Sequence, residues 1–179
     1  KTTIAKLKKS PKIRVAFYVN DSKWKCQNLY NLMAANDSYE PFIIIGKNDV
    51  ELGHFEYQTK ENILALYDYF KTRGMKVYLA YDFEKYKYIP LDKFKPDIIF
   101  YSRQWKIPQI HNILETSKFA LTCYVPYFIS NSPAKLEAGS DFHNKLWRYY
   151  ILNNDLKTEY SKVMKNHGKN LKVVGYPEL

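Results

Sequence analysis

Glycine, cysteine and histidine are scarce in this sequence, and their scarcity disfavours several classes of site. The 179 residues include six glycines, two cysteines and four histidines. The turn NDSKWK, which follows the first apolar segment, has no glycine, although a dinucleotide site uses glycines there to let backbone approach a pyrophosphate. Neither a P-loop nor a Gly-x-Ser-x-Gly nucleophile elbow occurs. A nicotinamide or flavin dehydrogenase is therefore disfavoured, and a P-loop nucleotidase is excluded.

The sequence also lacks the spacings with which proteins bind metals. Cys26 and Cys123 lie far apart in the chain, and we interpret both as buried thiols. The four histidines share no ligand spacing; they are His54, His111, His143 and His167. No Asp-x-Asp pair occurs that could hold a metal-bound sugar nucleotide. We therefore expect neither a cofactor nor a metal ion.

Long hydrophobic runs and an apolar leader are missing, whereas positive charge is in excess. The longest apolar runs, FIII and DIIFY, are far too short to cross a membrane, and no charged-then-apolar leader opens the chain. The net charge is +10, and residues 1–14 carry six basic groups and no acid. We interpret residues 1–11 as a basic tail, either a solvated linker or a segment that touches an anionic surface. The rest of the chain has no strong nucleic-acid signal.

Short apolar strands alternate with amphipathic helices along the remaining chain. Six strands are predicted to begin near residues 13, 41, 76, 97, 119 and 171. Helical spacing of apolar residues predicts five helices, over residues 26–33, 63–70, 110–114, 142–150 and 156–164. The first is predicted to be capped by Asp21 or Ser22, and the second to be capped by Thr59 and closed by Gly74. Pro108 is predicted to open the third. Continuous apolar strands between such helices indicate a parallel sheet covered on both faces. The predicted fold class is α/β, a doubly wound, largely parallel, Rossmann-like sheet in residues 12–179.

Such a sheet binds ligands at the carboxyl ends of its strands, near the point where the strand order reverses. Three segments follow predicted strands there, namely VNDSKW, YSRQW and YVPYF. In YSRQW, Arg103 could clamp a phosphate while Tyr101 and Trp105 stack on a sugar; the alternative is a surface turn packed on the next helix. The candidate binding residues are Asn20, Arg103, Gln104, Trp105, Tyr124 and Tyr127. We expect Asn20, Arg103, Trp105 and Tyr127 to converge at one edge of the sheet. For Tyr124 and Tyr127, the alternative is that they pack in the core.

His143 is the candidate general base. A base for a hydroxyl nucleophile works best with a pKa near neutral, which histidine offers unperturbed. Of the four histidines, only His143 follows the fifth predicted strand closely, on a predicted helix where Trp147 shares its face. A structural histidine is the alternative.

Five segments, taken in order, resemble the CDP-glycerol:poly(glycerophosphate) glycerophosphotransferase family, and more closely its capsule-associated members. They are SKWKCQNLYNLM, YEPFIII, KPDIIFYSRQW, ALTCYVPY and LKVVGYPEL, and the similarity covers most of residues 12–179. The resemblance implies a GT-B architecture of two Rossmann-like domains. Residues 12–179 would be the N-terminal, acceptor-side domain, and a CDP-linked polyol donor would bind a C-terminal domain outside this chain.

The resemblance also implies an activity. Glycerol phosphate, or a related polyol phosphate, would pass to a hydroxyl of a cell-surface glycan or lipid-linked acceptor, with release of CMP and without a cofactor. The protein would be cytoplasmic, at the inner face of the plasma membrane, where the basic tail could touch anionic lipid. Two alternatives stay open: a GT-B glycosyltransferase that uses a nucleotide-sugar, and a non-catalytic α/β module that binds a glycan or a phosphate.

The chain departs from the family at one point. Teichoic acid polymerases of the family carry a Trp-His-Gly-Thr-Pro motif whose histidine is taken as the base. The matching stretch here is CYVPY, with Tyr124 at the position of that histidine. Tyrosine, with an ordinary pKa of about 10, is a poor base at neutral pH.

Overall fold

A computed structural model describes residues 10–20, 24–48, 59–128 and 133–175, together with Ile4 and Leu7. Its centre is one seven-stranded sheet with the order β3-β2-β1-β6-β7-β8-β9. Every pairing in that sheet is parallel. The strands are β1 (Ile13–Val19), β2 (Tyr39–Ile45), β3 (Val77–Leu79), β6 (Ile98–Tyr101), β7 (Leu121–Tyr124), β8 (Arg148–Ile151) and β9 (Leu171–Val173). The predicted α/β class, with a doubly wound parallel sheet, is confirmed.

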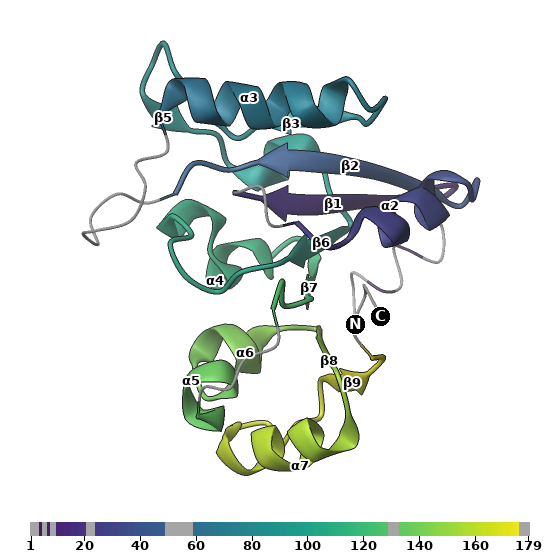
Figure 1. Cartoon of the computed structure of the whole chain (residues 1–179), viewed down its shortest axis with the longest axis vertical. Helices are drawn as coiled ribbons and strands as arrows, with labels where there is room; N and C mark the ends of the chain where they lie inside the picture. Colours follow the sequence, from purple (N-terminus) through teal and green to yellow (C-terminus); the bar gives the residue numbers. More distant parts are fainter. Residues whose placement is uncertain are drawn as a thin grey trace.

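Helices cover both faces of the sheet (Figure 1). They are α2 (Gln27–Ala34), α3 (Lys60–Lys71), α4 (Ile113–Thr116), α5 (Ala134–Ala138), α6 (Asp141–Lys145) and α7 (Asn154–Val163), with 3-10 turns η1 (Leu91–Phe94) and η2 (Gln109–His111). The chain winds in one direction from β1 to β3 and in the other from β6 to β9. Because parallel crossovers are right-handed, this reversal puts α2 and α3 on one face and α4 to α7 on the other.

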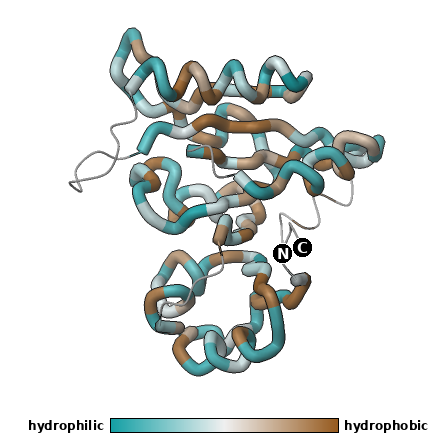
Figure 2. Tube along the Cα trace, viewed as in Figure 1, coloured by the Kyte–Doolittle hydropathy of each residue, from teal (hydrophilic) through white to brown (hydrophobic). Residues whose placement is uncertain are grey.

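The central strands are apolar because both of their faces are buried. The last five residues of β1 and of β2 are all buried, and the later part of β2 is a continuous brown segment in Figure 2. On one face Phe17 and Ile43 pack in a cluster with Phe70 of α3. On the other face Tyr18 and Ile44 belong to the cluster that α4 to α7 cover. Such unbroken apolar runs are typical of strands in a doubly covered parallel sheet.

Side-chain caps begin three of the described helices, α3, α4 and α7. The Thr59 hydroxyl accepts a hydrogen bond from the backbone N–H of Asn62 at 3.2 Å, at the start of α3. Asn153 accepts one from the N–H of Leu156 at 2.9 Å, at the start of α7. Gly74 follows the end of α3 with φ 74°, the left-handed conformation common beyond helix ends. The predicted cap and the predicted closing glycine of α3 are both confirmed.

Residues 142–150 do not form the single helix that their spacing predicts. α6 ends at Lys145, Leu146 is extended with ψ 140°, and β8 follows. In β8, Tyr149 faces the α4–α7 side of the sheet, whereas Tyr150 faces the α2–α3 side. This alternation is the period of a strand, which aromatic residues also favour. The sheet therefore has one strand more than the six predicted.

Pro108 does not open the predicted helix either. It precedes the short turn η2, and α4 is a single turn that begins at Ile113. Ile110 is 38% exposed and Leu114 is 47% exposed, whereas His111 is buried. Within η2 the residue turned toward the core is therefore His111 and not Ile110, and of the predicted stripe Ile113 is buried.

A two-stranded hairpin extends the third predicted strand beyond the sheet. The spacing of KVYLAY predicts one strand, but β3 ends at Leu79. Beyond it, β4 (Tyr81–Asp82) pairs antiparallel with β5 (Lys87–Tyr88). The hairpin thus projects from the carboxyl end of β3.

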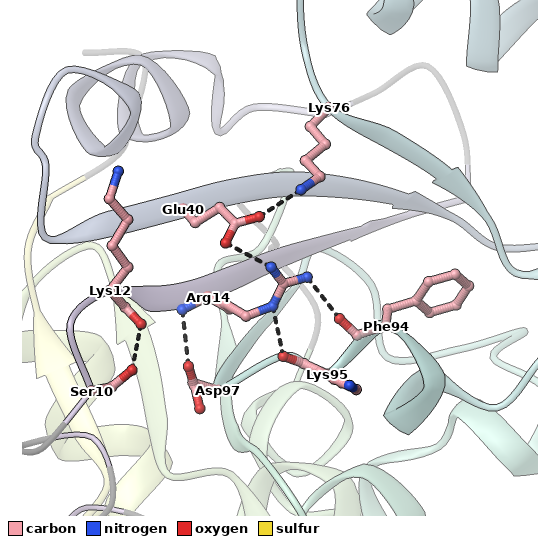
Figure 3. Close-up of polar contacts among 8 residues, drawn as sticks. All are labelled: Ser10, Lys12, Arg14, Glu40, Lys76, Phe94, Lys95 and Asp97. Atoms are coloured by element: carbon pink, nitrogen blue, oxygen red, sulfur yellow. Dashed lines mark hydrogen bonds and ion pairs between the residues drawn. The ribbon is translucent and has the colours of Figure 1, made fainter.

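A polar network joins four strands near their amino ends (Figure 3). Arg14 of β1 forms an ion pair with Glu40 of β2 at 2.6 Å, and Glu40 forms another with Lys76, just before β3, at 2.6 Å. The Arg14 guanidinium also donates to two backbone carbonyl oxygens before β6, both at 3.0 Å. The Arg14 backbone N–H donates to the Asp97 carboxylate at 3.0 Å. Hydrogen bonds from Lys76 and Arg14 lower the pKa of the Glu40 carboxyl.

Some predictions concern residues outside the described part of the chain. They are most of the basic tail 1–11, the caps Asp21 and Ser22, the loop histidine His54, and the end of LKVVGYPEL. Across the described ranges, no helix combines the length and the apolar character that crossing a membrane requires.

Candidate functional site

An arginine and three aromatic rings gather at the carboxyl ends of β6 and β7. The Arg103 guanidinium lies 4.8 Å from the centre of the Tyr127 ring. The Trp105 ring lies 6.3 Å from that of Tyr127 and 5.9 Å from that of Phe128. All four side chains are partly exposed. We call these residues, Arg103, Trp105, Tyr127 and Phe128, the arginine–aromatic cluster.

The parallel register brings these residues together. Tyr101 at the end of β6 pairs with Tyr124 at the end of β7 and with Tyr18 of β1. The residues that follow these strands therefore leave the sheet at the same edge, beside the point between β1 and β6 where the strand order reverses. Lys106, in the same loop, has a left-handed φ of 58°, which is uncommon for a residue with a side chain. The convergence predicted for Arg103, Trp105 and Tyr127 is confirmed.

Arg103 is a cation held partly out of water. Burial lowers its pKa from the ordinary value, while the neighbouring Tyr127 and Tyr124 oppose this shift. Arginine stays protonated at physiological pH even so, because its ordinary pKa lies above 12. A guanidinium with aromatic neighbours and a partly exposed face can bind a phosphate or a carboxylate through paired N–H donors.

The other two predicted polar contacts point away from this cluster. Gln104 donates to the carbonyl oxygen of Leu136 in α5 at 3.5 Å. Asn20 follows β1 at the same edge, and its amide donates to the Asn48 side chain at 2.6 Å, on the β2 side. Asn20 thus shares the edge with Arg103 but turns toward the opposite half of it.

Tyr124 belongs to the core. Its side chain is fully buried, and its ring packs against Phe142, His143 and Tyr149 at 5.3, 5.9 and 5.0 Å. Its hydroxyl has no hydrogen-bond partner among the described residues, and burial raises its pKa well above the ordinary value. Of the two open interpretations of this tyrosine, core packing describes its position.

His143 lies in the same buried group and not at the exposed edge. Its imidazole is fully buried and stacks on Tyr149 at 5.4 Å with an interplanar angle of 22°. Nδ1 lies 2.9 Å from the Ser140 hydroxyl, and Nε2 has no partner in the described structure. Burial lowers the pKa of His143 to about 4. Trp147, predicted to share its face, lies beyond the end of α6 and packs on the opposite side of the sheet.

A second buried histidine, His111, is not among the predicted site residues. Nε2 of His111 lies 2.8 Å from the carbonyl oxygen of Ile89 and so donates to it, which leaves Nδ1 to accept from the Tyr18 hydroxyl at 3.1 Å. Burial lowers the pKa of His111 to about 4. Tyr88, whose ring lies 5.6 Å from that of His111, donates to the carbonyl oxygen of Asn48 at 3.3 Å. This chain of contacts lies beneath the β2 side of the carboxyl edge of the sheet, toward which Asn20 turns.

Comparison with known proteins adds no assignment to this geometry. No protein-family model matches the chain, and the curated proteins contain no match to it. Within residues that the structure describes, no three His, Cys, Asp or Glu side chains group as a metal site would require. The family resemblance of the sequence therefore stays a prediction.

Proposed function

We propose that the arginine–aromatic cluster binds a phosphorylated polyol or glycan acceptor, and that the domain is the acceptor half of a two-domain transferase. The observation that carries this proposal is the Arg103 guanidinium over the Tyr127 ring beside Trp105, at the carboxyl edge of a doubly wound sheet. The guanidinium supplies charge-assisted donors for a phosphate, and the rings supply apolar surface for the C–H groups of a polyol or sugar.

The proposed reaction is a phosphoryl transfer. An acceptor hydroxyl oxygen attacks the phosphorus that carries the polyol in a CDP-linked donor. The bond from this phosphorus to the oxygen of the CMP phosphate breaks, a phosphodiester forms, and CMP leaves while the hydroxyl proton passes to a base. Arg103 would hold a phosphate of the acceptor, so that the hydroxyl is positioned for attack. The donor and its phosphate contacts belong, in this proposal, to a second domain.

No exposed residue at the carboxyl edge of the sheet is assigned as the base of this reaction. His143 stays the prediction of the sequence, but its complete burial and its pKa of about 4 both weigh against the role. The same burial favours one alternative function, a module that binds a phosphorylated glycan without doing chemistry. Both functions require the same ligand at Arg103.

Ligand binding by Arg103 is tested with a matched pair of arginines. Arg148 lies over Trp147 at 4.7 Å, much as Arg103 lies over Tyr127, but Trp147 packs on the α2–α3 side of the sheet. We expect Arg103→Gln to weaken binding of glycerol 3-phosphate by about tenfold or more, as loss of a charge-assisted bond implies. Arg148→Gln should leave binding unchanged. Isothermal titration would measure both, with glycerol as the uncharged control ligand.

Equal binding by the Arg103→Gln and Arg148→Gln variants would reject the site. Binding alone does not separate a transferase from a binding module. Release of CMP from CDP-glycerol in the presence of a glycerol phosphate acceptor, by a protein that includes this domain, would establish the transferase. Tight binding of the acceptor with no turnover of the donor would establish the module.

A further inference from the structure

The β4–β5 hairpin carries a second group of aromatic rings to the carboxyl edge. The Tyr81 ring lies 5.0 Å from Phe83 and 5.1 Å from Tyr88, edge to face in both cases. All three rings are partly exposed. Because the hairpin continues from the carboxyl end of β3, these rings lie at the same edge as Arg103, on the other side of β1.

Two lysines lie over these rings. Lys47 follows β2 with its ammonium 5.2 Å from the centre of Tyr81, and Lys60 opens α3 with its ammonium 5.8 Å from Phe83. Neither lysine forms an ion pair with a carboxylate in the described part of the chain. Both ammonium groups therefore have coordination left for an anion.

The hairpin carries two acidic residues, Asp82 and Glu84, and the Asp82 carboxylate is engaged within the turn. The Asp82 carboxylate accepts the backbone N–H groups of Glu84 and Lys85, both at 3.0 Å, and pairs with the Lys85 side chain at 3.7 Å. Its charge is thereby engaged within the hairpin turn. Tyr86, at the same turn, is 80% exposed and has a left-handed φ of 51°.

We propose that Lys47 and Lys60, with Tyr81 and Phe83, form a second subsite that binds another phosphate of the same acceptor. This inference rests on the function proposed for Arg103 and deepens it. The strands β2 and β6, which lead to Lys47 and Arg103, are two strand spacings apart, about 10 Å. A ligand that reaches both subsites must carry at least two phosphate groups and cross the edge above β1. The acceptor class that fits is a flexible phosphodiester polymer.

The experiment compares short and long ligands on the described domain. Glycerol 3-phosphate can occupy one subsite, whereas a glycerol phosphate octamer can occupy both. We expect the octamer to bind at least tenfold more tightly, because the second contact becomes intramolecular. The double variant K47Q/K60Q should reduce octamer affinity to nearly that of the monomer while it leaves monomer affinity within about twofold. Titration calorimetry would measure each pair.

The same helix provides a matched control. Lys71 lies over Tyr67 at 5.4 Å and Arg73 over Tyr69 at 3.5 Å, both at the opposite end of α3 from Lys60. The double variant K71Q/R73Q removes as much charge but should leave octamer affinity unchanged. Thermal unfolding of both double variants checks that any loss of binding is not a loss of fold.

The outcomes separate this inference from the proposed function. If octamer and monomer bind equally well, and Arg103→Gln alone weakens both, the second subsite is rejected and the Arg103 site stands. If neither ligand binds, both proposals are rejected. If a single-stranded RNA oligonucleotide of equal charge binds as tightly as the octamer through the same lysines, the subsite recognises phosphodiester charge alone, and its assignment to the polyol phosphate acceptor is wrong.

Discussion

Two buried histidines of this protein have equal burial but unequal partners. His111 uses both ring nitrogens, one with the Ile89 carbonyl and one with Tyr18, whereas Nε2 of His143 has no partner among the described residues. Burial lowers the pKa of each imidazole to about 4. Both side chains are therefore neutral in the folded protein over most of the physiological pH range. Each destabilises the folded state when the pH is lowered.

We predict that stability falls as the pH falls from about 6.5 toward 4. An unfolded histidine binds a proton below its ordinary pKa of about 6.5, and the folded ones bind it only near 4, so protonation favours unfolding within that window. Each histidine should cost about 1.4 kcal/mol per pH unit. Urea unfolding at pH 7 and pH 5 would measure the difference. An unfolding free energy that does not change between these values would contradict the prediction.

Substitution separates the two contributions. His143→Leu should remove about half of the loss between pH 7 and pH 5, with little cost at pH 7 because it strands only the Ser140 hydroxyl. His111→Leu strands a carbonyl and the buried Tyr18 hydroxyl, so it should cost about 1–3 kcal/mol at pH 7. The control for both variants is His167→Asn. His167 is exposed, and its φ of 53° is left-handed.

At the scale of elements, the sequence predicts six strands of the sheet but neither β8 nor the β4–β5 hairpin. β1 and β2 are unbroken apolar runs because both faces are buried, and no helix of that composition would be amphipathic. β8 has only four residues, and Tyr149 and Tyr150 satisfy helical spacing as well as alternation. Local pattern could not decide between the two, and pairing with β7 and β9 does. The hairpin β4–β5 is shorter still.

The cap of α7 offers a test at this scale. Asn153→Ala removes the bond to the N–H of Leu156 and should cost about 1 kcal/mol of stability. Asn154, the next residue, is exposed, and its side chain caps nothing. Asn154→Ala is therefore the matched control and should change stability by less than about 0.5 kcal/mol. Chemical unfolding measures both, and equal losses would show that the cap does not stabilise α7.

At the scale of the whole molecule, the topology allows a prediction of which residues meet at one edge of the sheet, but not of how deeply each side chain is buried. Arg103, Trp105 and Tyr127 could be predicted to converge because the ends of parallel strands share an edge. The depth of a side chain is a different matter, since it depends on which face each residue takes. Tyr124 alternates inward, and His143 of the short helix α6 is buried against Tyr124 and Tyr149. Neither fact is readable from spacing along the chain.

The polar network at the amino ends of the strands offers a test of stability at the scale of the whole molecule. Arg14→Met removes an ion pair and two bonds to carbonyl oxygens that join β1 to its neighbours, so a loss of about 1.5–3 kcal/mol is expected. Lys76→Met removes one pair whose lysine side chain is 47% exposed, with an expected loss below about 1 kcal/mol. Thermal or urea unfolding compares them. If the two losses are equal, the network does not depend on Arg14.

The position of β1 between β2 and β6 has a consequence for biosynthesis. The ribosome releases β1 and β2 early, but the partner for the other edge of β1 is β6, which follows one further strand, β3, and the β4–β5 hairpin. At about 5–20 residues per second, β1 waits several seconds with one unpaired edge. An exposed edge of that kind is a template for wrong association. The nascent chain is thus most in need of chaperones just before residue 101 emerges.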